Sequence, residues 1–255
     1  MAATAPTQVL TVNSLSLPLW RLGETDSTNA VAWRLLTEGQ TPPLAVQAES
    51  QSAGRGQWGR VWRSEPGGLY LSLLCAPQGD LLPQAPWVLA SAWGLADALN
   101  QVGAPAGLKW PNDLLLQGRK LGGIKLEAKG NALVIGAGLN WANPVPPTGA
   151  QLQPFCRSAG LSRLQTLEDL LSAALAGLVL GLNTYEKEGL APILAGYHRY
   201  FAHWGLEIEL PGGGQGVIQG VTPQGDLEVL CRSPGARVRR AFSPGSLRLG
   251  YSFDA

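Results

Sequence analysis

Apolar residues recur along the chain at two different spacings, which separate expected helices from expected strands. Helical spacing predicts four helices. The first begins at Asp26–Asn29 and ends near Gly39, and the others run from Pro86 to about Val102, from Thr166 to Leu182 and from Ala191 to about Trp204. Short apolar runs between turn residues predict strands over Leu44–Glu49, Leu69–Leu74, Leu114–Leu116, Leu121–Leu126 and Leu133–Gly138. Because the last three runs follow one another closely, we expect them to form a meander.

After Gly205 the pattern changes to short strands and turns alone. Strands are expected over Leu206–Leu210, Gly216–Val221, Leu227–Leu230, Val238–Phe242 and Leu247–Leu249. Such a segment is predicted to form a small β-barrel that docks on its neighbour. We therefore expect a flexible lead-in over residues 1–19, a larger domain of mixed helices and strands over 20–205, and the barrel over 206–255.

Composition narrows the classes of function. Of the 255 residues, 45% are hydrophobic and 15% are charged, which is typical of a folded globular chain. The formal net charge of +1 argues against a protein that binds nucleic acid mainly through phosphates. The most apolar stretch, Leu170–Leu182, is shorter than the roughly 18 residues of a membrane span and indicates a core helix.

The N-terminal segment indicates the cellular location of the chain, and the spacing of its cysteines indicates their redox state. No basic residue lies before Arg21, so the charged start of a secretory signal is missing. Cys75, Cys156 and Cys231 lie far apart and fit neither a zinc pattern nor paired disulfides. We expect reduced thiols and a cytoplasmic location. The roughly 20 residues before Glu24 are too few for a DNA-reading domain.

The segment Gly54–Arg60 reads Gly-Arg-Gly-Gln-Trp-Gly-Arg and contains the spacing G-x-G-x-x-G. A dinucleotide site would need a helix directly after it, but a proline and two glycines precede the strand at Leu69 and leave no room for one. A P-loop would need Lys and Ser or Thr where Arg60 and Val61 stand. The loop remains suited to an anion, because its glycines open the backbone and Arg55 and Arg60 offer planar guanidinium groups. An exposed turn with solvated arginines is the alternative.

A second cationic position lies further along the chain. The run Lys109–Asp113 reads Lys-Trp-Pro-Asn-Asp, which by itself indicates a hairpin turn. Lys120 stands near Gly122 and Gly123 on an expected strand, so open backbone surrounds its ammonium group and an anion fits there. Asn140 ends the next strand, where it could orient a polar ligand or an ion.

In this order, these segments resemble the biotin protein ligases, also called biotin-[acetyl-CoA-carboxylase] ligases. The resemblance covers about residues 20–250 and rests on Ser27–Asn29, Gln51–Gly56, Gly59–Trp62, Lys109–Asp113, Lys120–Glu127 and Ile135–Asn140. It implies an α+β fold in which helices flank a mixed β-sheet, similar to the class II aminoacyl-tRNA synthetase core, with a C-terminal SH3-like barrel. It also implies ATP, Mg²⁺ and biotin as ligands.

The resemblance implies a reaction in two steps. The biotin carboxylate attacks the α-phosphate of ATP to give biotinyl-5'-AMP and pyrophosphate, and a lysine of a biotin carboxyl carrier protein or domain then takes the biotinyl group. Because both steps develop or move anionic charge, positioned Arg and Lys side chains and backbone N–H groups could suffice without a protein nucleophile. His198 and His203 are accordingly interpreted as structural.

The family's site residues are carried over by position. Lys120 and Arg55 are the expected catalytic residues. Biotin is expected to contact Ser27, Thr28, Asn29, Gln51, Gly54, Arg55, Gly56, Gln57, Lys120 and Gly123. ATP is expected to contact Arg55, Arg60, Trp62, Asn112, Asp113, Lys120, Asn140 and Arg248, and Asn140 is also the expected metal ligand. Helix capping is a second expected role of Ser27, Thr28 and Asn29.

Two residues depart from the family's usual pattern. Gln57 stands where the loop usually has Arg, which removes a positive charge near the adenylate and predicts a weaker hold on it. Lys125 stands where an aliphatic residue is usual. Strand alternation places Lys125 on the face opposite to Ile124 and Leu126, toward solvent.

Two alternatives remain open. A lipoate protein ligase would share the fold and the adenylation chemistry, although the Gly-Arg-Gly loop and the Lys109–Asp113 run favour biotin. The expected barrel contains Arg232, Arg237, Arg239, Arg240 and Arg248, which raises nucleic-acid binding, but five acidic residues of the same segment balance them. We expect no DNA or membrane partner, and the sequence leaves formation of a homodimer undecided.

Overall fold

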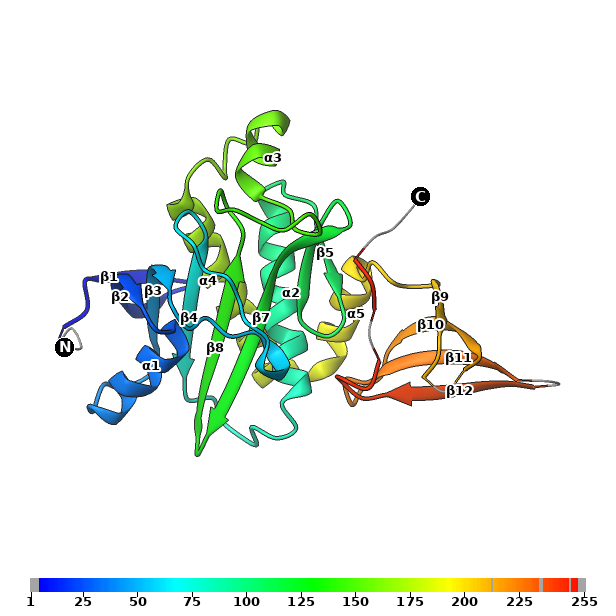
Figure 1. The fold of residues 1–255 in the computed structure, drawn as a ribbon. Coiled ribbons are helices and arrows are strands. Elements are labelled where there is room, and N and C mark those ends of the chain that lie inside the picture. The colour runs from blue at the N-terminus through cyan, green and yellow to red at the C-terminus, as the bar shows by residue number, and fades with distance from the viewer. Residues whose placement is uncertain (1–4, 212, 234–235, 248, 252–255) are drawn as a thin grey trace.

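The computed structural model describes residues 5–211, 213–233, 236–247 and 249–251 (Figure 1). The strands of the larger sheet are β1 (Gln8–Val12), β2 (Leu15–Thr25), β3 (Leu44–Gln51), β4 (Leu69–Cys75), β5 (Ala106–Lys109), β6 (Asp113–Leu116), β7 (Arg119–Lys129) and β8 (Ala132–Leu139). The helices are α1 (Thr28–Thr37), α2 (Ala85–Gln101), α3 (Leu152–Ala159), α4 (Leu167–Glu188) and α5 (Leu190–Tyr200), with a 3₁₀ turn η1 (Gln57–Gly59). The C-terminal sheet contains β9 (Glu207–Glu209), β10 (Gln215–Val221), β11 (Leu227–Ser233) and β12 (Ala236–Phe242).

The larger sheet is mixed, as expected. Its eight strands lie in the order β1-β2-β3-β4-β8-β7-β6-β5. The pair β2–β3 is parallel, and the other neighbouring pairs are antiparallel. Strands β5 to β8 follow one another as the predicted meander. Because β8 pairs with β4, the meander is joined edge to edge to the strands that precede it.

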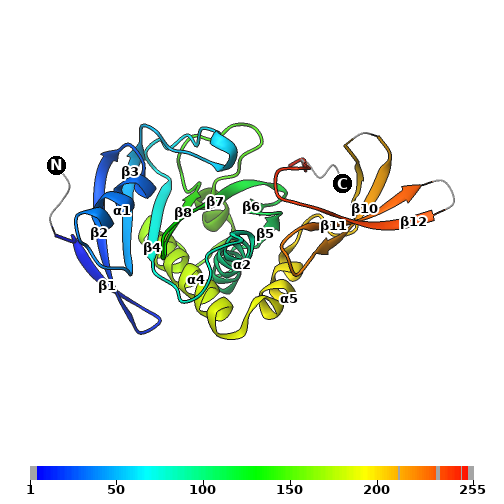
Figure 2. The ribbon, with the colours of Figure 1, turned by 90° about the horizontal axis from the view of Figure 1, so that it is seen from below.

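The two faces of this sheet differ. On one face, residues such as Leu71 of β4 and Ile135 of β8 pack in a continuous core with α2, α4 and α5. Figure 2 shows these helices together on one side of the sheet and the cyan loop between β3 and β4 on the other. Alternate residues point to the opposite face, where Leu74 and Val134 pack against α1. Further along β8 this second face continues with Gly136, which lies against Asn29 of α1, and Gly138, which lies against Trp62.

The expected flexible lead-in is wrong from Gln8 onward. β1 and β2 pair antiparallel, from Gln8 opposite Leu19 to Val12 opposite Leu15. Leu17 and Leu19 are fully buried. The segment is held because β2 also pairs in parallel with β3, a contact between positions that are distant in sequence. Local composition, which is small and polar, does not reveal such a pairing.

Four predicted helices are present, and a fifth was not predicted. α1 begins after Ser27, α2 contains Pro86 in its first turn, and α4 begins at a capping box formed by Thr166 and Asp169. α4 extends to Glu188, beyond the expected end. The additional helix is α3. It is short, and its sequence is too polar to show apolar residues repeating at helical spacing.

The C-terminal strands form an antiparallel sheet in the order β12-β11-β10-β9, consistent with the expected SH3-like domain. Its buried residues Ile218 and Leu227 join the apolar core of the larger domain. Trp110 Nε1 donates a hydrogen bond to the carbonyl oxygen of Gly225 at 2.9 Å. The small sheet therefore docks on the larger domain.

The domain boundaries remain predictions, and the expected boundary after residue 205 falls between α5 and β9. The strand expected over Leu247–Leu249 is not formed by Leu247 or Leu249, which lie outside strands. Arg248 lies outside the described residues. All three cysteines are free thiols.

α4 is long and apolar enough to cross a membrane by length and composition. Its Leu171, Leu175 and Leu178 are nevertheless fully buried against the protein. Its glycines Gly177 and Gly181 also lie against α2 so closely that side chains there would collide with α2 backbone. The interpretation of this segment as a core helix is therefore supported by its packing.

Replacing Gly94 of α2 with Ala tests this helix contact. In an open helix the change stabilises by about 1 kcal/mol, but here a Cβ would collide with the carbonyl oxygen of Gly177 and lie 2.8 Å from the backbone nitrogen of Gly181. We expect Gly94→Ala to lower the free energy of unfolding in urea by about 1–3 kcal/mol. Gly23→Ala is the control, since nothing lies within 4 Å of its Cβ. Equal unfolding midpoints for both variants would contradict the packing.

Candidate functional site

A cavity of about 760 Å³ opens on the second face of the larger sheet, beyond α1. The N-terminus of α1, the loop between β3 and β4, the β5–β6 turn, strands β7 and β8, and the segment after β12 contribute its walls. These segments are distant in sequence. The sheet therefore provides a floor, and the loop and the C-terminal segment complete the site around it.

One end of the cavity is a neutral polar network. Gln51 Oε1 accepts a hydrogen bond from the Thr28 backbone nitrogen at 2.9 Å, and Gln51 Nε2 donates to Ser64 Oγ at 2.7 Å. Ser72 Oγ lies 2.7 Å from Thr28 Oγ1 and 2.6 Å from Asn29 Oδ1. Ser27 occupies the N-cap position of α1 but makes no side-chain capping hydrogen bond. Mutual hydrogen bonds thus hold these side chains in fixed orientations before a ligand arrives.

Glu127 orients the Asn29 amide in this network. Its carboxylate accepts hydrogen bonds from Asn29 Nδ2 at 3.2 Å and from Trp33 Nε1 at 2.9 Å, and it pairs with Lys125 Nζ at 3.1 Å. Burial by itself raises the pKa of Glu127, but these three donors outweigh it and hold the pKa below its ordinary value. The carboxylate therefore stays ionised, and it directs the Asn29 amide nitrogen toward itself and Asn29 Oδ1 toward Ser72.

Glycines of β8 make room for the cavity. A Cβ on Gly136 would collide with Asn29 Oδ1, and a Cβ on Gly138 would lie 2.5 Å from Trp62 Nε1. The indole of Trp62 can lie against β8 only because Gly138 has no side chain. Trp62 Nε1 is buried and has no hydrogen-bond partner among the residues that the structure describes. It is therefore an available donor in the wall of the cavity.

The loop over the cavity is closed by its own backbone. Trp62 N donates to the carbonyl oxygen of Gly54 at 3.0 Å, and Gly56 N donates to that of Arg60 at 2.7 Å. Gly54 is buried, and a Cβ there would lie 2.5 Å from the Trp62 carbonyl oxygen. Gly54 does not line the cavity. It serves the packing of the loop, and its expected contact with ligand gains no support.

A bulge in β7 brings Lys120 to the cavity. Leu114 pairs with Gly122 but Leu115 pairs with Lys120, so Leu121 is the extra residue. Regular alternation would have placed Lys120 on the same face as Ile124, which belongs to the apolar core. Because the bulge adds one residue, the side chains before it lie on the opposite face from the one that regular alternation predicts. Lys120 therefore lines the cavity.

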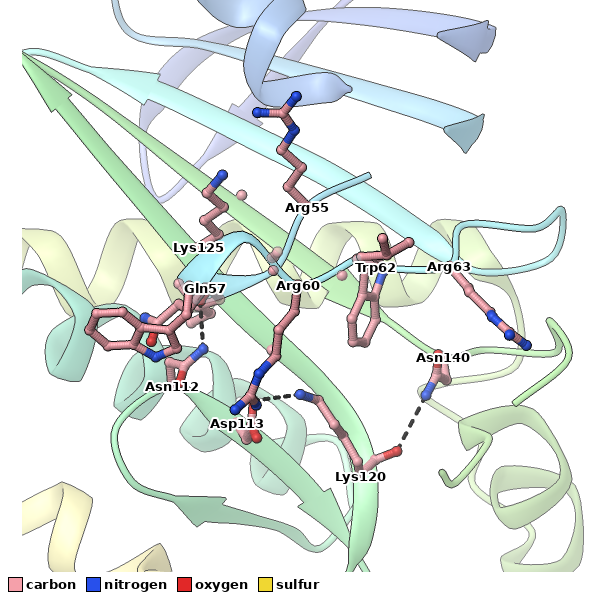
Figure 3. Close-up of a pocket in the computed structure, with 18 of the residues that line it drawn as sticks. Arg55, Gln57, Arg60, Trp62, Arg63, Asn112, Asp113, Lys120, Lys125 and Asn140 are labelled. Carbon is pink, nitrogen blue, oxygen red and sulfur yellow. Dashed lines mark hydrogen bonds and ion pairs between the residues drawn. The ribbon is translucent and has the colours of Figure 1, made fainter. Parts of the chain in front are cut away.

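Asp113 lies at the centre of a charged cluster at the other end of the cavity (Figure 3). Its Oδ1 is 2.8 Å from Lys120 Nζ, and its Oδ2 is 3.8 Å from Lys109 Nζ. The Tyr251 hydroxyl also donates to Oδ2. Burial lowers the pKa of Lys109 to about 8; Asp113 opposes this shift, whereas Lys120 and Arg60 add to it. The cluster has more cationic than anionic groups, so an anionic ligand would be attracted to it.

The two arginines of the loop point in different directions. Figure 3 shows Arg60 extending toward Asp113 and Lys120, while Arg55 points away, toward the blue N-terminal part of the fold. Both line the cavity. Arg60 therefore lies with Lys120 at the cationic end of the cavity, whereas Arg55 does not.

A sequence profile of the Biotin/lipoate A/B protein ligase family matches residues 23–140. The chain is also 34% identical to a biotin–[acetyl-CoA-carboxylase] ligase of Paracoccus denitrificans over 235 residues, which cover 85% of this chain and 95% of that relative. The chain belongs to the biotin protein ligase family. It is 34% identical to the bifunctional ligase/repressor BirA of Escherichia coli over 79% of this chain and 66% of that protein.

Solved structures of the family agree with this membership. The biotin protein ligase from Aquifex aeolicus in complex with biotin and ATP superposes with a TM-score of 0.73 at 27% identity. The superposition covers 92% of this chain and 99% of that one. The shared fold thus includes the larger sheet and the C-terminal sheet.

The cavity brings together most residues that the family resemblance assigns. It is lined by Ser27, Thr28, Asn29, Gln51, Arg55, Gly56, Gln57, Arg60, Trp62, Asn112, Asp113, Lys120, Gly123 and Asn140. Gly54 is outside the lining, and Arg248 lies outside the described residues. The role of each residue toward a ligand stays a prediction.

Asn112 and Asn140 hold the backbone around the cluster. Asn112 Nδ2 donates to the Ile124 carbonyl oxygen at 2.8 Å, and Asn140 Nδ2 donates to that of Lys120 at 3.3 Å. Asn140 Oδ1 accepts from Asn143 Nδ2 at 3.1 Å. Both amides therefore secure the strands that present Lys120.

The histidines lie outside the lining of the cavity, in keeping with their structural interpretation. His198 Nε2 accepts a hydrogen bond from the Val221 backbone nitrogen at 3.0 Å and so holds the small sheet to α5. His203 Nε2 lies 3.4 Å from the Gly250 carbonyl oxygen, and burial lowers the pKa of His203 to about 4.

Sequence reasoning missed several residues of the site. The expectation that Lys125 faces solvent is wrong, because it lines the cavity beside Glu127. Lys109 was part of a recognised motif without a role of its own, although its i,i+4 spacing from Asp113 was a usable signal. Tyr251 gave no signal, because it reaches the site only through the docking of the C-terminal segment.

Replacing Glu127 with Leu tests the network at the polar end. The Asn29 amide, the Trp33 indole N–H and the Lys125 ammonium would lose their acceptor, so we expect the free energy of unfolding in urea to fall by about 2–3 kcal/mol. Glu207→Leu is the control. Glu207 pairs with Arg232 at 2.7 Å with both side chains more than half exposed, and its loss should cost less than about 1 kcal/mol. Similar losses in the two variants would contradict the proposed importance of the network.

Proposed function

We propose that this chain is an ATP-dependent biotin protein ligase, which forms biotinyl-5'-AMP and transfers biotin to a lysine of a biotin carboxyl carrier protein or domain. One observation carries this proposal: a single cavity has a preformed neutral polar network at one end and a cationic cluster at the other. Biotin has a polar, uncharged ureido group at one end and a carboxylate at the other. Its length would join the two ends of the cavity.

The polar end favours biotin over lipoate. The Asn29 amide and the Thr28–Gln51 pair line the cavity and offer oriented polar groups to the N–H and carbonyl groups of a ureido ring. The dithiolane ring of lipoate has no N–H or carbonyl group, so it would make no hydrogen bond with these polar side chains. A site built for hydrogen bonds discriminates more strongly than one that only measures apolar size.

The cationic end suits the adenylation step. Lys120 can neutralise the biotin carboxylate and the α-phosphate as they approach, which lowers their mutual repulsion. Arg60 and Lys109 extend the positive region around Lys120, and Trp62 Nε1 offers a further donor. Holding both reactants in this orientation supplies much of the remaining rate enhancement. Attack by the carboxylate oxygen on the α-phosphorus would release pyrophosphate.

Transfer of the biotinyl group needs an amine, which the carrier lysine would supply. Asp113 is the only carboxylate residue among the described residues that line the cavity. An incoming ammonium group would find its electrostatic partner there. After losing one proton to solvent, the amine would attack the acyl carbon of the adenylate. The bond to the phosphate oxygen would break, AMP would leave, and the second proton of the nitrogen would pass to solvent.

Magnesium fits this site as an ion held mainly by nucleotide phosphates. No group of three or more His, Cys, Asp or Glu side chains that could hold a metal occurs in the described part of the chain. Mg²⁺ at nucleotide sites commonly takes one or two protein oxygens, with phosphates and water completing its shell. Asn140 remains the proposed protein ligand, with one acceptor position of Oδ1 already taken by Asn143.

The remaining expectations about the cellular setting are proposals as well. A cytoplasmic location would supply ATP and carrier protein. The absence of a DNA partner stays a prediction, which a DNA-binding measurement checks. Formation of a homodimer stays undecided, and the mass in solution would determine it. The predicted weak hold of the Gln57 loop on the adenylate also stays a prediction, although Gln57 does line the cavity.

The decisive experiment is exchange of pyrophosphate with ATP in the presence of biotin or of lipoate, followed by transfer to a biotin carboxyl carrier domain. We expect exchange in the presence of biotin and none in the presence of lipoate. Lys120→Ala should reduce it by two or more orders of magnitude, since an electrostatic contribution of about 3 kcal/mol is lost. Lys129→Ala is the matched control, an exposed lysine on the same strand. Absence of exchange with biotin in the unaltered protein would refute the proposed function.

ATP affinity should depend on pH through Lys109. Because burial lowers the pKa of Lys109 to about 8, its ammonium form is present below that pH and is lost as the pH rises through it. We expect ATP to bind about tenfold more weakly at pH 9.5 than at pH 7, the size of one charge-assisted contact. Calorimetric titration of the Lys109→Met variant should show weaker binding at pH 7 and no such decrease. A variant that retains the full decrease would show that another group causes it.

A further inference from the structure

The chain after β12 returns from the small sheet to the larger domain (Figures 1 and 2). Four alternate residues of this segment line the cavity, namely Gly245, Leu247, Leu249 and Tyr251. The segment is also fixed at its start, where Gly245 lies against Trp58 of the loop so closely that a Cβ would be 2.8 Å from the indole.

Tyr251 makes three contacts with the charged cluster. Its hydroxyl donates to Asp113 Oδ2 and accepts from Lys120 Nζ at 3.2 Å. Its ring lies beneath Lys109 Nζ, 3.2 Å from the ring centroid. One side chain therefore touches three charged residues of the cavity wall, Lys109, Asp113 and Lys120.

We propose that Tyr251 is a positioning residue for the adenylation step, which holds Lys120 and Asp113 in their working arrangement from the C-terminal segment. This inference rests on the proposed function. Lys120 has a long side chain with many rotamers, and its Nζ is held at two points, Asp113 and the Tyr251 hydroxyl. Without the hydroxyl the ammonium group keeps one of these two hydrogen bonds, the one to Asp113, and Asp113 Oδ2 loses its closest donor.

The ring has a separate effect. The face of an aromatic ring attracts a cation, so the Tyr251 ring stabilises the charged form of the buried Lys109. Phe at position 251 would preserve this contact and the packing of the segment while removing the hydroxyl alone. Tyr251→Phe therefore isolates the two hydrogen bonds.

The test compares Tyr251→Phe with Tyr200→Phe in biotin-dependent pyrophosphate exchange by the full chain. Tyr200 also donates to a carboxylate, Asp97 Oδ1 at 2.8 Å, but it lies outside the lining of the cavity. We expect Tyr251→Phe to lower kcat about tenfold with the KM for biotin unchanged, because binding at the polar end does not involve the hydroxyl. The Tyr200→Phe variant should keep the kcat of the unaltered protein. Thermal unfolding of both variants is measured alongside.

Each other result overturns the inference. An unchanged kcat shows that the hydroxyl does not position Lys120, and a raised kcat shows that it obstructs the site. A fall in kcat that is matched by Tyr200→Phe, or accompanied by an equal rise in KM and a large loss of thermal stability, indicates general destabilisation. Failure of the unaltered protein to exchange with biotin is a separate result, which removes the proposed function and this inference together.

Discussion

The Asp113 carboxylate is the interaction on which the site depends. It lies where a hairpin turn, a bulged strand and the C-terminal segment meet, and it contacts a group from each: Lys109, Lys120 and Tyr251. Three cationic side chains close together, with Arg60 as the third, repel one another unless an anion lies among them. Asp113 provides that anion in the protein itself. It reduces the repulsion among the cations in the folded protein, and the net charge of the cluster stays positive, so the cluster still attracts an anionic ligand.

The larger sheet forms the rigid floor of the cavity and leaves space above it for a ligand. One face is covered by α2, α4 and α5. On the other face, Leu74 and Val134 pack under α1, and the glycines of β8 then leave space where side chains would have filled it. A ligand with a neutral polar head and an anionic end can therefore lie along the same strands, with each end at a group of matching chemistry.

Much of this could be read from the chain. The helices, the meander and the loop with its glycines and arginines have local signals, and an ordered set of motifs identified the family and most of the cavity's lining. The errors concern contacts between segments. The hairpin that begins at Gln8 is held because its second strand pairs with β3, Lys125 faces a cavity instead of open solvent, and Gly54 packs against the backbone of Trp62 instead of a ligand.

By itself, the sequence determined which residue types were available and the local elements that contain them, because helical and strand periods, caps and turns act over a few residues. Only the tertiary structure decided which of those residues meet. The bulge at Leu121 changes the face on which Lys120 lies, and pairing of that strand with β6 produces the bulge. Tyr251 reaches Asp113 across 138 positions because the small sheet docks on the larger domain. Such contacts arise from packing of whole elements, which no short stretch of sequence encodes.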